Sequence, residues 1–328
     1  MAEKLLDVKN LKTYFFTDEG IAKAVDDISF DINYGETVGL VGESGCGKSV
    51  TSLSIMRLLK AHTLEGEILL EGSDLMKMSN AQLAKLRGQD IGMIFQDPMT
   101  SLDPVFTIGY QMRETILKHH KMTKAEADEL AVSLFTQVGI PDPEATLKRY
   151  PHELSGGQRQ RVMIAMAMTC DTKLLIADEP TTALDVTIQA QILNLMSKIK
   201  EEKGNSILII THDLGVVSEL CDRVIVMYCG KIVESGDVRQ IFNDPQHPYT
   251  KALLASIPSL ELEQDRLSTI QGVVPSITAL PTGCRFHPRC EMACDVCKSE
   301  YPKMKEVADG HFAACHFAGT LAGGTQNE

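Results

Sequence analysis

The chain has 328 residues, of which 44% are hydrophobic, enough for a substantial core in one large domain with subdomains or in two domains. Its 32 basic and 44 acidic residues give a formal net charge of −12, which argues against a nucleic-acid partner, because binding phosphate backbones needs concentrated Lys and Arg. The sequence has no apolar run of the roughly 18–20 residues that span a bilayer and no signal-peptide hydrophobic region after Met1, so a soluble, intracellular protein is expected.

The first part of the chain alternates apolar and polar residues, as β-strands do. We expect strands over residues 5–16, 28–32 and 67–70 that form an antiparallel lobe. Three consecutive aromatic residues, Tyr14, Phe15 and Phe16, end the first of these strands. One of these flat rings is suited to stack on an adenine base, whereas ordinary strand packing accounts for at least two of the three.

The most informative stretch is Gly42-Glu43-Ser44-Gly45-Cys46-Gly47-Lys48-Ser49, which matches the phosphate-binding pattern G-x-x-x-x-G-K-S. Its glycines let successive backbone N–H groups turn inward around a phosphate without Cβ clashes. Lys48 supplies a charge for the β- and γ-phosphates, and Ser49 supplies a hydroxyl for Mg²⁺. A strand over 37–41 enters the loop and a helix over 50–59 leaves it, so a helix N-terminus points at the phosphates. By itself, the loop predicts a nucleoside triphosphate ligand.

The middle of the chain changes from strand to helix. A buried strand over 91–95 ends at Gln96, a position from which a side chain reaches a bound metal or water. The pattern is then helical from Met99 to Tyr150, and Thr123 begins a capping box that Glu126 completes. This block predicts a helical insertion into an α/β core. The apolar face of its capped helix, which Gly139 and Pro141 end, carries Leu130, Leu134, Phe135 and Val138.

Two further motifs follow this block. The run Leu154-Ser155-Gly156-Gly157-Gln158 precedes a helix over 159–168 and again exposes backbone donors to an anion, a weak signal when taken alone. A buried strand of four apolar residues, 174–177, follows Lys173 and leads to two carboxylates, Asp178 and Glu179. Asp178 is suited to hold Mg²⁺ directly or through water, and Glu179 to polarise a water for attack on a γ-phosphate.

The remaining elements complete an α/β pattern. We expect a strand over 206–210 that ends near His212, and ligands bind at the carboxyl ends of parallel strands. Two strands over 224–228 and 231–234 read as a hairpin around Cys229 and Gly230. Ahead of these strands, Ala183-Leu184-Asp185 opens a helix over 186–203 whose core face carries Ile188, Ile192, Leu195 and Ile199.

Taken in this order, the motifs resemble those of the ATP-binding subunits of ABC transporters over roughly residues 1–245. The order is the phosphate loop, Gln96, the run 154–158 (the Leu-Ser-Gly-Gly-Gln signature of that family), the strand end 174–179, Leu184-Asp185 and His212. Three further runs are similar to the dipeptide/oligopeptide importer branch, and in particular to its dipeptide-permease D-type subunit: Phe95-Gln96-Asp97-Pro98-Met99-Thr100-Ser101-Leu102, residues 177–191, and His247-Pro248-Tyr249-Thr250-Lys251-Ala252-Leu253-Leu254.

The resemblance implies a role for each motif residue. Tyr14 would stack on adenine, with Phe15 as its rival. Glu179 would act on the attacking water and His212 on the γ-phosphate, while Gln96 would sense the γ-phosphate and the membrane subunits. Ser49, Gln96 and Asp178 would serve Mg²⁺. The signature residues Ser155, Gly156 and Gly157 would contact ATP held by a partner ATPase subunit. The triphosphate of ATP would be bound by Gly42, Glu43, Ser44, Gly45, Cys46, Gly47, Lys48, Ser49 and Val50.

Five of the nine cysteines lie close together in the C-terminal region. Cys294 and Cys297 have the close spacing of zinc ligands, and would be joined by Cys284 or Cys290 and by Cys315. Alternatively, Cys284, Cys290, Cys297 and Cys315 offer four thiolates for an iron–sulfur cluster. The peptide-importer family has this second spacing and is associated with a [4Fe-4S] cluster there, which leaves Cys294 as an extra thiol. Reduced cysteines without a metal are the third alternative, and the intracellular setting disfavours disulfides.

The expected architecture is therefore an α/β P-loop NTPase core with an antiparallel β lobe, an inserted helical subdomain and a Cys-rich C-terminal extension. Residues 1–255 would form the ATPase domain, with the helical subdomain at 97–150, and residues 256–328 the extension. The resemblance implies an ATPase that powers dipeptide or oligopeptide import from the cytoplasmic face of the membrane. Its partners would be a sibling ATPase subunit in a head-to-tail dimer, two integral membrane permease subunits and, indirectly, an extracytoplasmic peptide-binding protein. The alternatives are import of another cargo, such as a nickel chelate, and a soluble ABC ATPase of DNA repair or translation.

Overall fold

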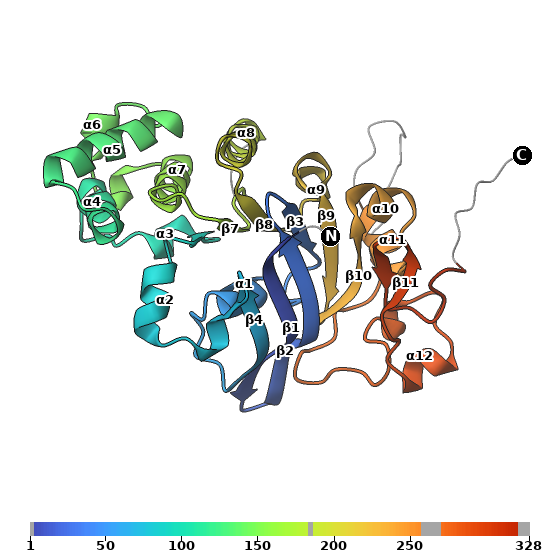
Figure 1. The fold of residues 1–328 in the computed structure, drawn as a ribbon. Coiled ribbons are helices and arrows are strands. Elements are labelled where there is room, and N and C mark those ends of the chain that lie inside the picture. The colour runs from blue at the N-terminus through green and yellow to red at the C-terminus, as the bar shows by residue number, and fades with distance from the viewer. Residues whose placement is uncertain (1–2, 183–185, 257–269, 321–328) are drawn as a thin grey trace, which may run out of the picture. The chain divides into compact units, whose positions relative to one another are not determined.

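The computed structural model describes residues 3–182, 186–256 and 270–320. The chain divides into two compact units, and Figure 1 labels the helices and strands of both. The first comprises Ile32–Glu36 and Lys77–Ile210 together with the N-terminal residues, and the second comprises Leu6–Asp31, Thr37–Met76 and the chain from Thr211 onwards. Both units combine strands with helices, which confirms the predicted α/β class.

Three short parallel strands form the sheet of the first unit, in the order β6-β7-β8. Every residue of these strands is buried, which confirms that the apolar runs are interior strands. In register, Ala177 of the central strand lies opposite Ile94 on one side and Ile209 on the other. The strands are β6 (Ile91–Ile94), β7 (Leu174–Asp178) and β8 (Ser206–Thr211).

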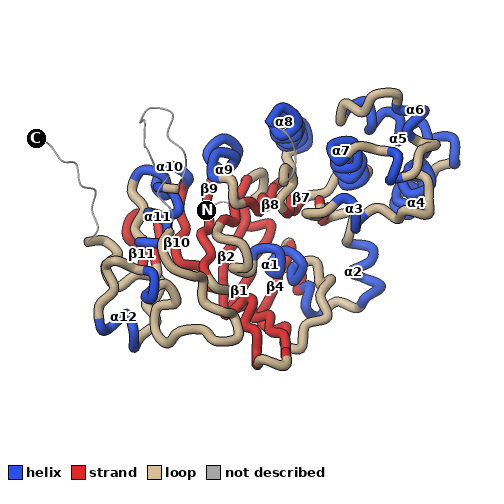
Figure 2. Tube along the Cα trace, turned by 180° about the vertical axis from the view of Figure 1, so that it is seen from behind, coloured by secondary structure: helices blue, strands red, loops and turns tan. Residues whose placement is uncertain are grey.

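Between β6 and β7 the chain is largely helical, as predicted (Figure 2). The helix α5 packs against α4, α6 and α7. The helices of this unit are α2 (Asn80–Leu86), α3 (Pro98–Ser101), α4 (Ile108–His119), α5 (Lys124–Gln137), α6 (Pro143–Thr146), the 3₁₀ turn η2 (Pro151–Glu153), α7 (Gly156–Ala167) and α8 (Val186–Lys203).

The predicted capping box at the start of α5 is present. The Thr123 hydroxyl accepts a hydrogen bond from the Glu126 N–H at 3.3 Å, and the Glu126 carboxylate accepts one from the Thr123 N–H at 2.6 Å. On the predicted apolar face, Leu134, Phe135 and Val138 are buried, whereas Leu130 is only half-buried. The box supplies partners for two N–H groups at the helix start that have none within the helix, which explains why α5 begins directly after Thr123.

The helix α7 begins at Gly156, three residues earlier than expected. Its N-cap is Ser155, whose hydroxyl accepts from the Gln158 N–H at 3.3 Å while the Gln158 side chain accepts from the Ser155 N–H at 3.0 Å. The two glycines therefore lie inside the first helical turn and not in a loop before it. The helix α8 has the predicted bounds. Residues 183–185, expected to open α8, and the side chain of Ile199 lie outside the described part of the chain.

The second unit contains a sheet in which β3 runs parallel to β9. The predicted hairpin between β9 and β10 is confirmed, and Cys229 and Gly230 form its turn with positive φ angles of 44° and 78°. Beyond β10 the sheet continues with two strands from the Cys-rich region, in the order β10-β12-β11. The strands are β3 (Thr37–Val41), β9 (Arg223–Tyr228), β10 (Lys231–Asp237), β11 (Lys305–Ala308) and β12 (His311–Ala313).

A second sheet has the order β2-β1-β4-β5, and its pairs β1–β4 and β4–β5 are antiparallel. Two of its strands extend well beyond their predicted ranges: one begins at Gly20 instead of residue 28, and another at Thr63 instead of residue 67. Cross-strand pairing supports residues there whose own pattern does not alternate. The strands are β1 (Lys4–Thr17), β2 (Gly20–Asn33), β4 (Thr63–Leu70) and β5 (Ser73–Asp74).

The helix that leaves the phosphate loop, α1, spans Lys48–Ile55 and not the expected 50–59. It begins earlier because Gly47, with φ at 106°, is its N-cap, and it ends earlier because the chain turns at Arg57, whose φ is 48°. Among the described residues, no helix has both the length and the apolar character needed to cross a bilayer. The other helices of this unit are η1 (Leu75–Lys77), α9 (Leu214–Leu220), α10 (Val238–Asn243), α11 (Pro248–Ala255), η3 (His287–Arg289) and α12 (Asp295–Ser299).

Candidate functional site

The phosphate loop lies between β3 and α1, as the sequence predicts, and two of its glycines cannot be replaced without a clash. A Cβ on Gly42 would lie 2.2 Å from the Met227 carbonyl oxygen, and a Cβ on Gly47 would lie 2.2 Å from the Ala24 carbonyl oxygen. Both residues also have positive φ angles. The loop thus lies directly against the β2 and β9 backbones, which explains why glycine stands at these two positions.

The side chain of Lys48 is folded over this loop. Its Nζ donates to the carbonyl oxygens of Gly42 at 2.7 Å and Glu43 at 3.1 Å, and the residue is 5% exposed. The ammonium is therefore held over the start of the loop by two backbone acceptors. Cys46 is buried beneath the loop, and burial raises the pKa of its thiol, which keeps it an uncharged, small packing residue. Ser49 and Val50 lie in the first turn of α1.

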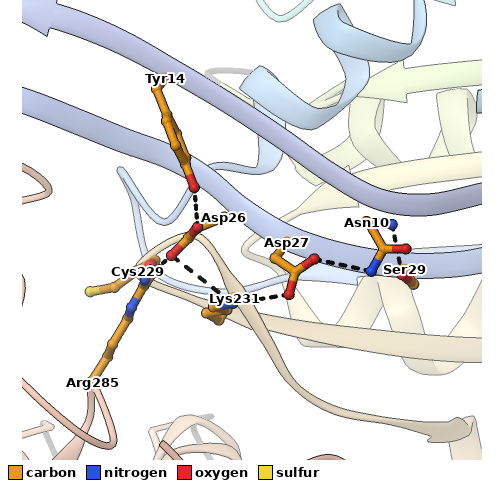
Figure 3. A network of polar contacts seen from close by, with 8 residues as sticks. All are labelled: Asn10, Tyr14, Asp26, Asp27, Ser29, Cys229, Lys231 and Arg285. Carbon is orange, nitrogen blue, oxygen red and sulfur yellow. Dashed lines mark hydrogen bonds and ion pairs between the residues drawn. The ribbon is translucent and has the colours of Figure 1, made fainter. Parts of the chain in front are cut away.

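Tyr14 lies near the end of β1, and its hydroxyl donates to the Asp26 carboxylate (Figure 3). Burial, and then this hydrogen bond, raise the pKa of the Tyr14 hydroxyl. The ammonium of Lys23 lies 5.7 Å from the centroid of the Tyr14 ring, so the ring is fixed at its polar end. Of its neighbours, Phe15 is half-buried, while Phe16 is exposed and stacks on His62 at 4.8 Å.

In the first unit, the structure brings Gln96 and Glu179 together. The Gln96 amide donates to Glu179 Oε2 at 3.1 Å, and the Thr182 hydroxyl donates to the same oxygen at 2.9 Å. Glu179 itself has a φ of 46°, in the left-handed region that non-glycine residues seldom adopt. Next to it, Asp178 ends β7 and is only 3% exposed. Sequence reasoning missed Thr182, although it lies only three residues after the glutamate.

The other predicted residues lie at exposed element ends. Ser155 and Gly156 are exposed and Gly157 is half-exposed on the first turn of α7, where free N–H groups are available to an anion. A Cβ added to Gly156 would meet no atom within 4 Å, so this turn has open space before it. His212 is exposed immediately after β8, and the next residue, Asp213, caps α9 by accepting from the Gly215 N–H at 2.9 Å.

Four of the C-terminal cysteines converge on one small cavity of the second unit, lined by Cys284, Cys290, Cys297 and Cys315 together with aromatic, histidine and proline side chains. Cys294 does not line this cavity, although its sulfur lies 3.6 Å from that of Cys297. Burial raises the pKa of the Cys284 thiol to about 11, and the neighbouring thiols act in the same direction. A raised pKa favours the neutral thiol, so the fit to a group that takes four thiolates comes from the number and convergence of the cysteines that line the cavity. Within the described residues, however, no three or more His, Cys, Asp or Glu side chains are already placed to hold a metal ion.

Comparisons with known proteins agree with these motifs. Residues 25–182 match the family model described as "ABC transporter", and residues 233–297 match that described as "Oligopeptide/dipeptide transporter, C-terminal region". Among the curated relatives, the oligopeptide transport ATP-binding protein AppD of Bacillus subtilis is 54% identical over 95% of this chain and 96% of its own length. The dipeptide transport ATP-binding protein DppD of the same organism is 51% identical over 95% and 94%.

A solved structure supports the same assignment. The ATP-binding cassette MJ0796, in a dimeric post-hydrolysis state bound to ADP and Pi, aligns with a TM-score of 0.66 and 28% identity over 71% of this chain and 99% of its own. The two family models, the near full-length relatives and this fold together leave one conclusion. The chain belongs to the ATP-binding proteins of ABC transporters, in the group that carries the oligopeptide/dipeptide transporter C-terminal region.

Proposed function

We propose that the chain is the ATP-binding and hydrolysing subunit of an importer that takes dipeptides or oligopeptides across the cytoplasmic membrane. The observation that carries the hydrolytic part is the strained Glu179, whose carboxylate is oriented by Gln96 and Thr182 at the end of a buried strand. The peptide cargo is supported by two relatives above 50% identity whose names state oligopeptide and dipeptide transport.

In this proposal the loop N–H groups and Lys48 bind the β- and γ-phosphates of ATP. Ser49, Gln96 and Asp178 would hold a Mg²⁺ ion, which would offset the charge that develops on the phosphates during transfer. Glu179 accepts a proton from the attacking water, whose oxygen bonds to the γ-phosphorus. The bond from that phosphorus to the β–γ bridging oxygen breaks, and ADP leaves with the electron pair on that oxygen. His212 steadies the γ-phosphate, and Tyr14 stacks on the adenine.

The signature residues imply a partner. One phosphate loop and one Leu-Ser-Gly-Gly-Gln run per chain suit a head-to-tail dimer with a sibling ATPase subunit, in which the first turn of α7 faces the nucleotide of the other subunit. Gly156 and Gly157 would donate to those phosphates through N–H groups that a helix start leaves free, and Ser155 would donate through its hydroxyl, because its N–H is used by the Gln158 side chain. The dimeric state of the MJ0796 cassette supports this arrangement.

The helical segment 97–150 would dock two integral membrane permease subunits at the cytoplasmic face. Support comes from a set of exposed apolar side chains around the start of α4, where Val105 is 69% exposed and Phe106 and Tyr110 stack at 4.6 Å. Exposed apolar groups of this size are typical of interaction surfaces. An extracytoplasmic peptide-binding protein would act through those membrane subunits and not through this chain.

The test uses the assembled transporter in cells that lack this subunit. Wild-type chain restores uptake of a labelled dipeptide, and Glu179→Gln does not, although it still binds ATP. Glu219→Gln, which changes an exposed glutamate of α9, serves as the control and restores uptake. Wild-type hydrolysis by the Glu179→Gln transporter would refute the role of Glu179. Restored nickel uptake with no dipeptide uptake would favour the alternative cargo, and failure to co-purify any membrane subunit would favour a non-transport ATPase.

A finer part of the proposal concerns the cysteines. Cys284, Cys290, Cys297 and Cys315 would hold a [4Fe-4S] cluster, a group that takes four thiolate ligands, and their convergence on one cavity supports this set. Anaerobically purified protein should contain about four iron and four sulfide per chain. Cys297→Ser should lose the iron, whereas Cys294→Ser should keep it. Stoichiometric zinc without sulfide, lost in both variants, would replace the cluster with a zinc site that includes Cys294.

A further inference from the structure

Two buried arginines from the Cys-rich region reach the elements that surround the phosphate loop. They are Arg285 and Arg289, and they lie between Cys284 and Cys290. The side chains are 9% and 3% exposed, respectively. Neither arginine belongs to any nucleotide-binding motif that the sequence shows. Each nevertheless contacts a carboxylate: Arg285 that of Asp26 in β2, and Arg289 that of Glu43 in the phosphate loop. The planar guanidinium donates hydrogen bonds in fixed directions, so a buried arginine holds the groups that it contacts in one orientation.

Arg289 holds the second residue of the phosphate loop. Its Nη1 lies 2.6 Å from Glu43 Oε2 and its Nη2 lies 3.0 Å from Glu43 Oε1, a bidentate pair. The remaining donors reach the Tyr228 hydroxyl and two backbone carbonyl oxygens, those of Ile270 and Gln271. These five contacts use all five N–H groups of the guanidinium. The guanidinium is therefore held in place on all sides. A shift of the segment that carries Arg289 would shift Glu43, and with it the phosphate loop.

Glu43 is in turn held through its backbone. Its N–H donates to the Tyr249 hydroxyl at 2.8 Å, and its carbonyl oxygen accepts from Lys48 Nζ at 3.1 Å. A shift of Glu43 would thus move an acceptor of the lysine that is proposed to bind the phosphates. The pairing also has an electrostatic effect, because an unpaired carboxylate in this loop would repel a triphosphate, and Arg289 neutralises it.

Arg285 acts on the other end of the proposed ATP site. Its guanidinium donates to the Asp26 carboxylate and to the Cys229 carbonyl oxygen (Figure 3). Asp26 also accepts from the Tyr14 hydroxyl and lies 4.0 Å from Lys231 Nζ. The chain of contacts runs from the Cys-rich segment through one carboxylate to the tyrosine that is proposed to stack on adenine.

We propose that Arg285 and Arg289 are positioning residues for the nucleotide: the segment between Cys284 and Cys290 braces the phosphate loop through Glu43 and the adenine-side Tyr14 through Asp26. The inference rests on the proposed ATP site and adds the dependence of that site on the C-terminal region. ATP affinity depends on this segment, and by linkage ATP binding stabilises the segment in return. Any group bound by the thiols of Cys284 and Cys290, which flank this segment, is thereby coupled to nucleotide binding.

The test measures equilibrium binding of ATP with Mg²⁺ to the full-length chain by calorimetry. Arg289→Gln should raise the Kd about fivefold or more. The double variant Glu43→Gln/Arg289→Gln should bind ATP more tightly than Arg289→Gln, because the repelling carboxylate is gone. Arg289→Lys should fall between wild type and Arg289→Gln. A merely structural role would make the double variant no better than the single one.

A matched control is Arg113→Gln. Arg113 forms a bidentate pair with Asp128 at 2.9 and 2.8 Å between α4 and α5, so the same kind of interaction is removed in the other compact unit. Its ATP affinity should equal that of wild type. For the adenine side, Arg285→Gln should weaken ATP binding but leave the affinity for inorganic tripolyphosphate unchanged, whereas Arg289→Gln should weaken both.

A second readout is amide hydrogen exchange of residues 284–290. ATP should slow exchange there in wild type and not in Arg289→Gln. Wild-type ATP affinity in a folded Arg289→Gln or Arg289→Lys variant, or exchange that ATP leaves unchanged in wild type, would overturn the inference. A wild-type chain that binds no ATP would instead refute the proposed function, so the two failures are distinct.

Discussion

Removal of the Glu234 carboxylate should strongly destabilise the second unit. Glu234 lies in β10 and is fully buried, and it accepts three hydrogen bonds: from the Gln246 N–H at 2.6 Å, from the His247 N–H at 2.8 Å and from His311 Nε2 at 2.8 Å. The first two donors stand at the start of α11, and the third comes from β12 of the Cys-rich region. One carboxylate therefore joins three segments that are distant in the sequence.

The magnitude follows from the donors that Glu234→Ala would leave behind. Gln246, His247 and His311 are each 3% exposed or less, so water cannot replace the lost acceptor. A buried donor without a partner costs about 1–3 kcal/mol, and three such donors would be left. We therefore expect Glu234→Ala to lower the free energy of unfolding by about 3 kcal/mol or more. Glu234→Gln keeps one acceptor oxygen, so its loss should be smaller.

The assay is urea unfolding of the full-length chain, followed by circular dichroism and by limited proteolysis of the C-terminal region. Glu67→Ala is the control, since Glu67 is 52% exposed and its contact with Lys9 is 3.9 Å long; it should change the free energy of unfolding by less than about 1 kcal/mol. If Glu234→Ala unfolded within this same margin of wild type, the reasoning that the carboxylate joins the three segments would be refuted.

Three shorter predictions concern the phosphate loop, a helix cap and acid stability. Gly47→Ala should weaken ATP binding about tenfold or more, because its Cβ would lie 2.2 Å from a β2 carbonyl oxygen. Gly45→Ala should lose less ATP affinity, because its Cβ would meet no atom within 4 Å. Equal losses of affinity in calorimetry would contradict this reasoning. Thr123→Ala should destabilise α5 by about 1 kcal/mol, while Thr136→Ala, which removes a hydroxyl from the last turn of the same helix, should cost less in thermal unfolding. Burial would raise the pKa of Asp26, but the hydrogen bond from Tyr14 and the nearby positive charges outweigh it and lower that pKa below 3.8. The stabilisation from the ionised carboxylate is therefore present above pH 3.8 and lost as the pH falls through the lowered pKa of the folded state. The difference in unfolding free energy between wild type and Asp26→Asn should shrink in acid. A difference that stays constant with pH would refute the assignment.

Much of the fold followed from local patterns. The buried parallel strands were predicted from apolar runs, and the cap of α5 from Thr123 and Glu126, because both signals are contained in a few neighbouring residues. The errors arose at element ends. The helix α1 begins at Lys48 and ends at Ile55 because of backbone conformations at Gly47 and Arg57 that composition does not reveal.

The candidate site was found as a set of motifs, but its contacts were not. The sequence placed Gln96 and Glu179 at strand ends, yet nothing in it showed that they share a hydrogen bond or that Thr182 joins them. The convergence of four cysteines on one cavity, without Cys294, was also visible only in three dimensions. Spacing restricts which thiols can meet but does not decide which ones do.

The sequence by itself determined the phosphate loop, the order of the nucleotide motifs and the resemblance to ABC transporter ATPases, because each depends on short runs whose chemistry is set by neighbouring residues. The tertiary structure alone decided that Arg289 pairs with Glu43, 246 positions away, and that Arg285 pairs with Asp26, 259 positions away. Contacts between such distant residues depend on how strands and loops pack, and local sequence carries no signal for them. The link between the Cys-rich region and the phosphate loop therefore became visible only in the folded chain.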